Sequence, residues 1–412
     1  MWRNIASNAL TLILVALVVA GSTLAWAKRE FTNAGPLVAG ICLKVDRGSN
    51  LSLVSDDLVA QGAVTSGTIF RLGARYSDRA PGLKFGSYLI PARASMTEIL
   101  AMVTGDGQST CGTEINYRIG VAAADMVLRE LDPGTNRYVE VAKFDPAVEA
   151  APPEFVAVQD AADTRLRVTL AEGVTSWQVA EALKRAPFLA GELGDPPAEG
   201  SLAPDSYEVD HGGDRAALLA EMASRQSAVL AELWASRAAD LPVASAEEAL
   251  VLASLVEKET GVTEERARVA SVFVNRLNQG IKLQTDPAVI YGLTKGKSLL
   301  GRGLRASELR SNTPYNTYVH AGLPPGPIAN PGRASIEAAL HPETTDYLFF
   351  VADGTGGHAF AATLAEHNDN VAKWRALEKL AIEKAALEKA ALEKLALEKA
   401  AADAANGGVV QP

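Results

Sequence analysis

The sequence has few of the residues that bind metals or build disulfide networks. Its 412 residues include two cysteines, Cys42 and Cys111, and five histidines, with no Cys/His cluster at metal-ligand spacing. Neither a zinc site nor a disulfide-dense scaffold is therefore supported, and we expect no metal and no other cofactor. The positions of the two cysteines leave open whether they pair.

Basic side chains are outnumbered by acidic ones. The chain has 39 Lys and Arg against 49 Asp and Glu, a formal net charge of -10. No basic stripe is available to follow a phosphate backbone, which argues against a nucleic-acid partner. Hydrophobic residues make up 48% of the chain. A chain of this length and composition can bury a sizeable core in about two to three domains.

One long uncharged run lies at the N-terminus, over residues 5–27, with basic residues at both ends. Such a run is long enough to cross a hydrocarbon layer of about 30 Å. We expect residues 1–29 to form a short cytoplasmic stub and a retained transmembrane anchor. A cleavable signal peptide is the alternative, because Ala25-Trp26-Ala27 resembles a cleavage site. A signal-like segment favours the exported side for the rest of the chain.

The pattern after the anchor predicts an α+β fold. Residues 30–150 carry short apolar runs separated by Gly, Ser and Asp, which is typical of a small α+β module. Within it, Ser95 with Glu98 as capping-box partner begins a helix that ends at Gly105. Residues 151–243 form a linking α+β part. The Pro- and acid-rich stretch over residues 145–160 is interpreted as a linker or an edge excursion.

A helical hairpin follows. Ser245 begins a helix that ends near Glu259, and Thr263 is expected to cap a second helix that ends at Gly280. The stretch 282–332 is rich in Thr, Asn, Pro, Gly and Tyr but has little periodicity. Compact domains rarely hold such a stretch without a functional reason.

A mixed α/β domain over residues 244–373 is predicted to close with a strand inside 345–353 and a helix from about residue 366. Residues 374–412 form a low-complexity tail with Leu or Ile, Glu and Lys repeating every five residues. Five residues advance a helix by about 140°, so the apolar side chains spiral and form no coiled-coil seam. We expect a semi-rigid helical spacer, in preference to a partner-binding helix, with fraying over residues 407–412.

Two carboxylates, Glu257 and Glu259, lie close to the end of the first hairpin helix. On a helical wheel Glu259 falls among the apolar side chains of the helix, whereas Glu257 faces a less apolar arc. A carboxyl held against apolar side chains has a raised pKa, as a general acid near neutral pH requires. The structural alternative is an ion pair between Glu259 and Arg266 or Arg276, without a catalytic task.

Four sequence blocks between residues 250 and 368 closely resemble those of the endolytic murein transglycosylase (YceG-like) family. In chain order they are LVEKETGVTEERARVASVFVNRL, LQTDPAVIYGL, TPYNTYVHAGLPPGPIANPG and FFVADGTGGHAFAATLAEHN. Several long motifs in order make a specific match. Residues 83–107 are similar, more weakly, to the family's LysM-like subdomain, and EGSLAPDSYEV to its Glu-Gly, Pro-Asp-Ser/Thr-Tyr segment.

The resemblance implies a single-pass enzyme of the inner membrane with its catalytic domain in the periplasm. It implies cleavage of the β-1,4 bond between N-acetylmuramic acid and N-acetylglucosamine in nascent peptidoglycan, leaving 1,6-anhydro ends that terminate strand elongation. The C6 hydroxyl of the sugar attacks, so one carboxyl suffices where an ordinary glycosidase needs two. The implied catalytic residue is Glu259, with Glu257 as the fallback. Glycan strands and peptidoglycan synthases are the implied partners.

The resemblance also assigns substrate contacts to the loop blocks, with loop scaffolding as the alternative role. These residues are Gln284, Thr285, Asp286, Tyr291, Tyr315, Asn316, Thr317 and Tyr318. His358 and His367 match family blocks too, but an isolated histidine more often makes a hydrogen bond within the fold, so they rank below the others.

The chain departs from the family pattern in three places. Residues 109–160 are longer than expected, the tail is extra, and EGSLAPDSYEV lacks aromatic residues between Gly and Pro. Two other functions remain open. One is a membrane-anchored peptidoglycan-binding scaffold, and the other is a muramidase that uses water, for which Asp286 is the nearby second carboxylate.

Overall fold

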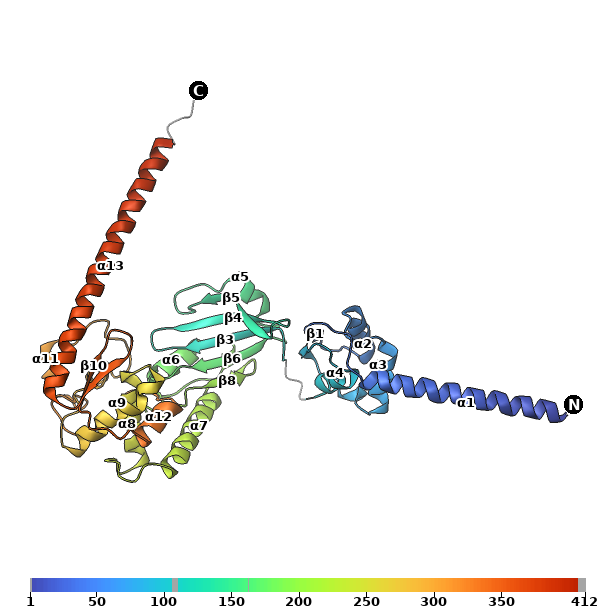
Figure 1. Ribbon diagram of the computed structural model, residues 1–412, viewed down its shortest axis with the longest axis horizontal. Coiled ribbons are helices and arrows are strands. Elements are labelled where there is room, and N and C mark those ends of the chain that lie inside the picture. The colour runs from blue at the N-terminus through green and yellow to red at the C-terminus, as the bar shows by residue number, and fades with distance from the viewer. Residues whose placement is uncertain (1, 106–109, 162, 407–412) are drawn as a thin grey trace. The chain divides into compact units, whose positions relative to one another are not determined.

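The computed structural model describes residues 2–105, 110–161 and 163–406 of the chain (Figure 1). The chain folds into two compact units, and it passes from one to the other more than once. The first unit comprises residues up to 169 with 185–191 and 205–215, and the second comprises 170–184, 192–204 and the residues from 216 onward.

The first unit begins with the helix α1 (Trp2–Thr32), drawn in dark blue in Figure 1. Within the described part of the chain it is the one helix long and apolar enough to cross a membrane. The candidate span is Leu10–Thr32, with a mean hydropathy of 2.2 and none of it buried in the protein. The expected N-terminal apolar helix is therefore present. It continues three residues past the expected boundary at residue 29.

A small α+β lobe follows α1. Its elements are β1 (Ile41–Val45), α2 (Leu51–Ala60), α3 (Gly67–Tyr76), the 3-10 turn Ala80–Gly82, β2 (Gly86–Ile90) and α4 (Met96–Val103). Strands β1 and β2 pair antiparallel, and the helices bury Leu58, Phe70 and Ile99 against them. At the start of α4, Ser95 accepts the Glu98 N–H while the Glu98 carboxylate accepts the Ser95 N–H, so the predicted capping box is confirmed.

The first unit also holds a five-stranded sheet, in the order β5-β4-β3-β6-β8, and a short parallel pair, β7 (Leu189–Ala190) with β9 (Gly213–Asp214). The strands of the sheet are β3 (Thr113–Ile119), β4 (Ala124–Asp132), β5 (Arg137–Phe144), β6 (Arg165–Leu170) and β8 (Ser206–Val209). The segment that is longer than expected supplies the β4–β5 hairpin and the short helix α5 (Pro153–Val158). The Pro-rich stretch is thus not a plain linker, because Phe155 of α5 packs edge-on against Phe144, with ring centroids 5.0 Å apart.

Cys42 and Cys111 form a disulfide, with Cα atoms 5.7 Å apart. The bond joins β1 to the segment that enters β3, across 69 residues of chain. It therefore encloses the small lobe in one covalent loop and settles the pairing that the sequence left open.

The second unit is mainly helical. Its helices are α6 (Ser176–Arg185), α7 (Arg215–Ala235), α8 (Ala246–Glu259), α9 (Arg266–Asn278), α10 (Asp286–Thr294), α11 (Ala306–Leu309), α12 (Arg333–Leu340) and α13 (Leu364–Asn406). The last residue of α6, Arg185, and the first residue of α7, Arg215, belong to the first unit. The antiparallel strands β10 (Phe349–Ala352) and β11 (His358–Ala361) complete it. Helix α8 packs between α9 and α12 and is buried from Ala249 to Val256.

The helix pair α8 and α9 differs from the prediction in one detail. Ser245 does cap α8, because its hydroxyl accepts the Glu248 N–H. Thr263, in contrast, caps nothing with its side chain and begins a 3-10 turn, Thr263–Glu265, so α9 starts only at Arg266. The Thr263 hydroxyl instead accepts a hydrogen bond from the Arg266 guanidinium at 3.4 Å.

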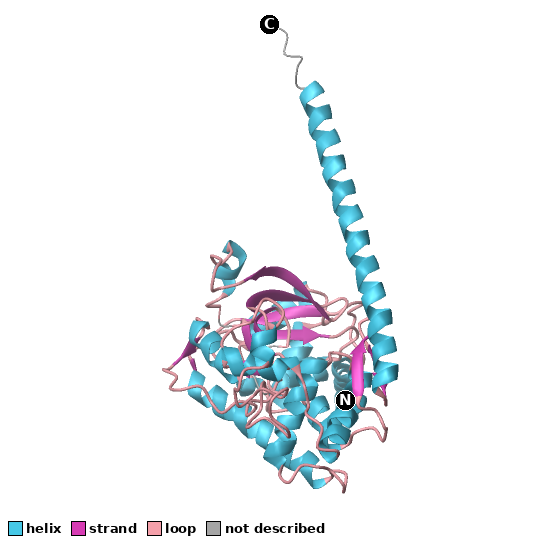
Figure 2. Cartoon of the chain, turned by 90° about the vertical axis from the view of Figure 1, so that its left-hand side faces the viewer, coloured by secondary structure: helices cyan, strands magenta, loops and turns pink. Residues whose placement is uncertain are grey.

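The tail is helical, as expected, and continues the last helix of the fold without a break. Helix α13 begins at Leu364, packs its first turns on β10 and β11, and runs on to Asn406 (Figure 2). Beyond Leu377, which lies against Gly354, the described side chains are exposed. The expected fraying of residues 407–412 lies outside the described residues.

Candidate active site

Helix α8 carries Glu259 at its last residue. The helix ends there because Thr260 has an extended backbone (φ -140°, ψ 134°) and Gly261 follows. The preceding turns are fixed in the core, where the Ser254 hydroxyl donates to the Val251 carbonyl at 2.7 Å and accepts the Ile328 N–H at 3.0 Å. Glu259 is thus held at the boundary between a rigid core helix and the solvent-accessible part of the unit.

The Glu259 carboxylate has one hydrogen-bond donor among the described residues, the Thr285 hydroxyl. Burial raises the pKa of Glu259, and the nearby Asp286 carboxylate raises it further. The Thr285 hydrogen bond and the electrostatic effects of His358 and Arg276 act in the opposite direction and are outweighed. A carboxyl in this environment keeps its proton to higher pH than a solvated one, which suits a general acid.

Thr285 is held in place by a reciprocal contact with Thr317. The Thr285 N–H donates to the Thr317 hydroxyl at 2.9 Å, and that hydroxyl donates to the Thr285 carbonyl at 3.2 Å. Both side chains are 2% exposed. These hydrogen bonds join the loop before α10, which ends at Thr285, to the loop that contains Thr317. Helix α10 begins directly after Thr285, at Asp286, with Pro287 in its first turn.

Asp286 and Tyr318 lie near enough to Glu259 to interact with it electrostatically, and Gln284 directly precedes Thr285. The Tyr318 hydroxyl donates to Asp286 Oδ1 at 2.7 Å, and burial raises the Tyr318 pKa. Gln284 has a left-handed backbone (φ 51°), and its N–H donates to the Thr317 carbonyl. Gln284 and Asp286 are exposed and Tyr318 is partly exposed, so these side chains are accessible to a ligand.

Asn316 and Thr317, expected to contact substrate or to act as loop scaffolding, are both buried. Asn316 is fully buried, and its amide donates to the carbonyls of Glu308, Leu309 and Ser311 while its oxygen accepts the Tyr318 N–H. The side-chain amide of Asn316 thus makes its hydrogen bonds within the loop that carries Tyr318, and its oxygen accepts one from that loop. These contacts favour the scaffolding alternative, and the role of both residues stays a prediction.

An aromatic pair, Tyr291 and Tyr315, lies along α10 with ring centroids 4.9 Å apart and planes at 55°. The Tyr291 hydroxyl donates to Glu199 at 3.1 Å, and Glu199 also accepts the Ser176 N–H at 2.8 Å. Burial raises the pKa of Glu199. Sequence reasoning assigned no role to Glu199, although the Glu-Gly block that contains it was a signal.

The side chain of Glu257 is only 6% exposed, although it lies on the less apolar arc of the helix. It accepts the Gly332 N–H at 3.0 Å and lies 3.9 Å from the Arg266 guanidinium, which also pairs with Glu172 at 3.0 Å. These covering groups are distant in sequence, so a helical wheel cannot reveal them. Glu257 ties the end of α8 to the start of α12.

Neither candidate arginine forms the alternative ion pair with Glu259 among the described residues. Arg266 pairs with Glu172 and Glu257. Arg276 donates to the carbonyls of Leu348 and Leu283, both at 2.6 Å. Its charge nevertheless acts on Glu259 through space.

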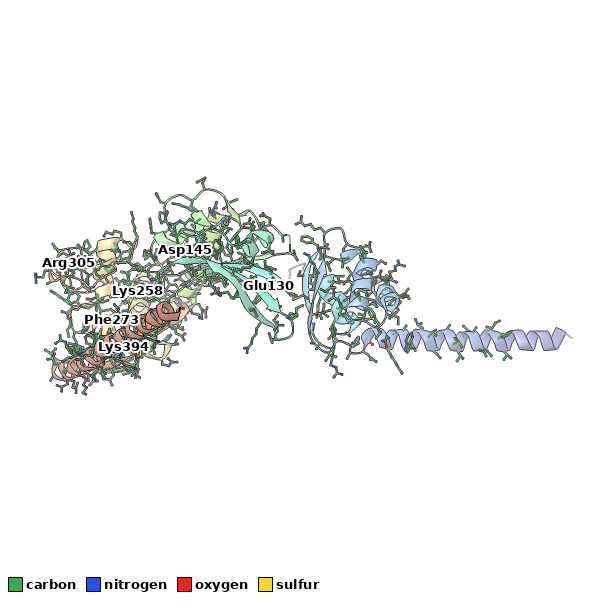
Figure 3. All side chains as sticks on the ribbon, turned by 90° about the horizontal axis from the view of Figure 1, so that it is seen from above. Glu130, Asp145, Lys258, Phe273, Arg305 and Lys394 are labelled. Atoms are coloured by element: carbon green, nitrogen blue, oxygen red, sulfur yellow. A yellow bond between two sulfur atoms is a disulfide. The ribbon has the colours of Figure 1, made fainter. Side chains whose placement is uncertain are left out.

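The other ionisable groups near α8 make contacts within the fold. His358 lies 2.8 Å from Glu265 through Nδ1, and His367 stacks on Phe349 with ring centroids 5.1 Å apart. Lys258, labelled in Figure 3, donates to the Gly173 carbonyl at 3.2 Å, and burial lowers its pKa. In the described part of the chain, no group of three or more His, Cys, Asp or Glu side chains could hold a metal ion.

The chain is similar to a known protein family and to curated proteins that carry the name of an enzyme. The model of the YceG-like family matches residues 43–373. An endolytic murein transglycosylase of Bacillus subtilis is 39% identical over 178 residues, which is 43% of this chain and 48% of that protein. An endolytic murein transglycosylase of Streptococcus pneumoniae serotype 2 is 36% identical over 182 residues, 42% of this chain and 32% of that protein. The matched regions thus span half or less of each relative.

Among solved structures, a YceG-like protein of Listeria monocytogenes is 24% identical. The alignment covers 80% of this chain and 98% of that chain, with a TM-score of 0.42.

Proposed function

The chain belongs to the YceG-like family, and from this premise we propose that it is an endolytic murein transglycosylase, a lyase that cuts inside peptidoglycan strands. The observation that carries the proposal is the buried carboxyl of Glu259 at the end of α8, which accepts the Thr285 hydroxyl and whose pKa is raised by its burial. The relatives named for this activity match the chain over 178 and 182 residues. We further propose residues 244–373 as the catalytic domain and the lobe containing β1, β2 and α4 as a LysM-like subdomain.

In the proposed reaction, Glu259 donates its proton to the glycosidic oxygen between N-acetylmuramic acid and N-acetylglucosamine. As the C1–O bond breaks, the C6 hydroxyl oxygen of the same muramic acid bonds to C1, and its proton passes to the Glu259 carboxylate. The products are a 1,6-anhydro end and a free 4-hydroxyl on the glucosamine. Water is not consumed, and the carboxyl returns to its protonated state.

The proposed sugar contacts are the accessible members of the set: Gln284, Asp286, Tyr291, Tyr315 and Tyr318. Tyrosine rings can pack on sugar faces, and amide and carboxylate groups can bond hydroxyls. Thr285 acts on Glu259 directly, and Asn316 and Thr317 act through the loops they hold. Asp286 has its Oδ1 committed to Tyr318, which favours a role in binding over activation of water.

We place the two units outside the cytoplasm, behind the anchor α1, in the periplasm of a cell with an inner membrane. The Cys42–Cys111 disulfide supports this placement, because disulfides persist in oxidising compartments and are rare in the cytosol. The anchor would keep the enzyme near newly made strands, and peptidoglycan synthases that extend those strands are the proposed partners.

The test is mass spectrometry of fragments released from purified peptidoglycan by the full chain in detergent. We expect anhydromuramyl ends from the native chain and from Glu257→Gln, and none from Glu259→Gln. The glutamine at 257 can still accept the Gly332 N–H, so it is the matched control. Products heavier by one water would identify a muramidase. No products from the native chain would leave a binding scaffold.

A further inference from the structure

The end of α1 is fixed to the helix α3 of the small lobe. The Phe31 ring lies so close to Gly73 that a Cβ there would be 2.2 Å from it. The Thr65 hydroxyl donates to Glu30, and the Thr97 hydroxyl donates to the Phe31 carbonyl at 3.1 Å. The direction in which the candidate span leaves the lobe is therefore set by packing and hydrogen bonds.

Three residues near the end of α1 mark where a membrane surface would lie. Trp26 is 60% exposed, and Lys28 and Arg29 are exposed. Trp and basic residues gather at membrane–water interfaces, where their polar ends reach the headgroups. Phe31 is two residues beyond Arg29, about 3 Å along the helix axis. Its partner Gly73 therefore lies within roughly one helical turn of the headgroup level.

Helix α3 exposes a mixed apolar and basic surface beside this contact. Leu72 is 58% exposed, Tyr76 is 96% exposed, and Arg75 lies on the same side of the helix. Arg79 follows directly and is also exposed. We name these residues the juxtamembrane face: Leu72, Arg75, Tyr76 and Arg79.

The charges of the juxtamembrane face are available to a partner. Among the described residues, neither Arg75 nor Arg79 is in an ion pair, whereas their neighbour Arg71 pairs with Asp56 at 3.0 Å. Asp78 lies among them and offsets one positive charge. Lys28 and Arg29 add two cations from α1, so the surface around the membrane exit is basic on a chain whose net charge is -10.

We propose that the juxtamembrane face binds the anionic lipid headgroups of the membrane that α1 spans. Arginines would contact headgroup phosphates, and Tyr76 and Leu72 would insert at the interface, as amphipathic surfaces with basic rims do. The acidic remainder of the chain is repelled by an anionic surface, so this contact would hold only the lobe against it. The proposal rests on the proposed anchoring by α1 and is independent of the proposed reaction.

The test is hydrogen–deuterium exchange of the full chain in nanodiscs of phosphatidylglycerol or of phosphatidylcholine. We expect the amides of residues 67–79 to exchange roughly fivefold or more slowly in the anionic discs. The double variant Arg75→Glu/Arg79→Glu should remove the difference. A matched control, Arg118→Glu/Arg137→Glu, makes the same charge change at exposed arginines of β3 and β5 and should keep it.

Equal exchange of residues 67–79 in the two lipids, with α1 protected in both, would overturn the proposal and leave the anchor intact. An unprotected α1 would overturn both. If the protection of residues 67–79 depends on protein concentration and not on lipid charge, a second copy of the chain covers this face. That result would also overturn the proposal. Unchanged exchange of the β1–β2 amides in both double variants shows that the lobe is folded.

Discussion

At the scale of single residues, the two glutamates of α8 show how much a helical wheel can decide. The wheel selects Glu259 because its own helix offers apolar neighbours there, and the raised pKa of Glu259 agrees with that choice. It does not show that Glu257 is buried too, because Gly332 and Arg266 cover that side chain from elsewhere in the chain. Periodicity within a helix describes the helix surface, whereas burial depends on what packs on it.

The hydrogen bond from Thr285 to Glu259 gives a prediction about pH. The bond stabilises the ionised carboxylate and so lowers the Glu259 pKa, against burial, which raises it. Thr285→Val removes the hydroxyl and keeps the side-chain shape. The pKa of Glu259 should then rise further, and the alkaline limb of the pH profile of kcat/KM should move to higher pH.

The backbone contacts of Thr285 with Thr317 remain in this variant, which limits other changes. Because the hydroxyl that positions the Glu259 carboxyl is removed, we expect kcat to fall by about tenfold, the equivalent of about 1.4 kcal/mol. Thr317→Val provides the comparison, because it breaks the hydrogen bonds between the loops without touching Glu259. An alkaline limb that stays in place in Thr285→Val would show that the hydroxyl does not set the Glu259 pKa.

At the scale of elements, the sequence predicts where helices begin better than it predicts the structure of the segments that connect them. Ser95 and Ser245 cap helices where expected, and β10 lies inside the predicted strand. Thr263 has the residue type of a cap but begins a 3-10 turn, and the stretch expected as a linker contains α5. Cap residues act locally within the chain, whereas Phe155 of α5 packs on Phe144 of the preceding strand β5, a tertiary contact that composition does not indicate.

The turn at Gly200 gives a prediction at this scale, because it carries Glu199 to Tyr291. Gly200 has φ 81°, and a Cβ there would lie 2.7 Å from Pro327. Gly200→Ala should therefore lose about 1–2 kcal/mol to backbone strain and about 1–3 kcal/mol more to overpacking. The free energy of unfolding of the second unit, from urea titration, measures the loss.

Gly322→Ala is the matched control for this loss. Gly322 has φ 83° in the same unit, but a Cβ there would meet nothing within 4 Å. It should show only the strain of about 1–2 kcal/mol. If Gly200→Ala and Gly322→Ala are equally stable, Pro327 can move away from the added Cβ, and the close packing at Gly200 does not contribute to stability.

At the scale of the whole molecule, local patterns in the sequence determine neither the covalent link between Cys42 and Cys111 nor the β4–β5 hairpin. Cysteine spacing could not reveal the Cys42–Cys111 pair, because pairing depends on how the lobe closes. The family resemblance predicted the catalytic blocks but not the β4–β5 hairpin, which belongs to the segment that departs from the family. Family motifs can be recognised in one sequence, whereas this added hairpin depends on strand pairing that the sequence pattern did not reveal.

The disulfide should stabilise the small lobe mainly by restricting its unfolded chain. For a loop of 69 residues the expected contribution is about 4 kcal/mol. In Cys42→Ser/Cys111→Ser, the slowest β1–β2 amides should exchange about a thousandfold faster. A reducing agent should do the same to the native chain and nothing further to the double variant. Equal exchange in native and variant chains would mean that the lobe is held by its core alone.

The last prediction concerns the tail, because the structure shows where its contacts with the rest of the protein end. Leu377 touches Gly354, but Leu380, Ile382, Leu387 and Leu392 are each more than 60% exposed. Beyond Leu377, ion pairs from Lys to Glu four residues later repeat along the rod at 3.8 to 4.0 Å. Exposed pairs of this kind contribute about 0.3–0.5 kcal/mol each to the helix and nothing to the fold below it.

A chain that ends at Lys379 should therefore keep the melting temperature of the second unit within about 1 °C and its activity within about twofold, since the packing of the core is unchanged. Its helical circular dichroism should fall by the contribution of the missing residues.

Truncation before Leu364 is the contrasting variant, because it also removes the turns of α13 that cover β10 and β11, and it should lower the melting temperature. A chain ending at Lys379 that is folded but inactive in cells, yet active on purified peptidoglycan, would show that the rod acts by reaching a partner. Inactivity in both settings would place the functional role of the rod within the protein itself.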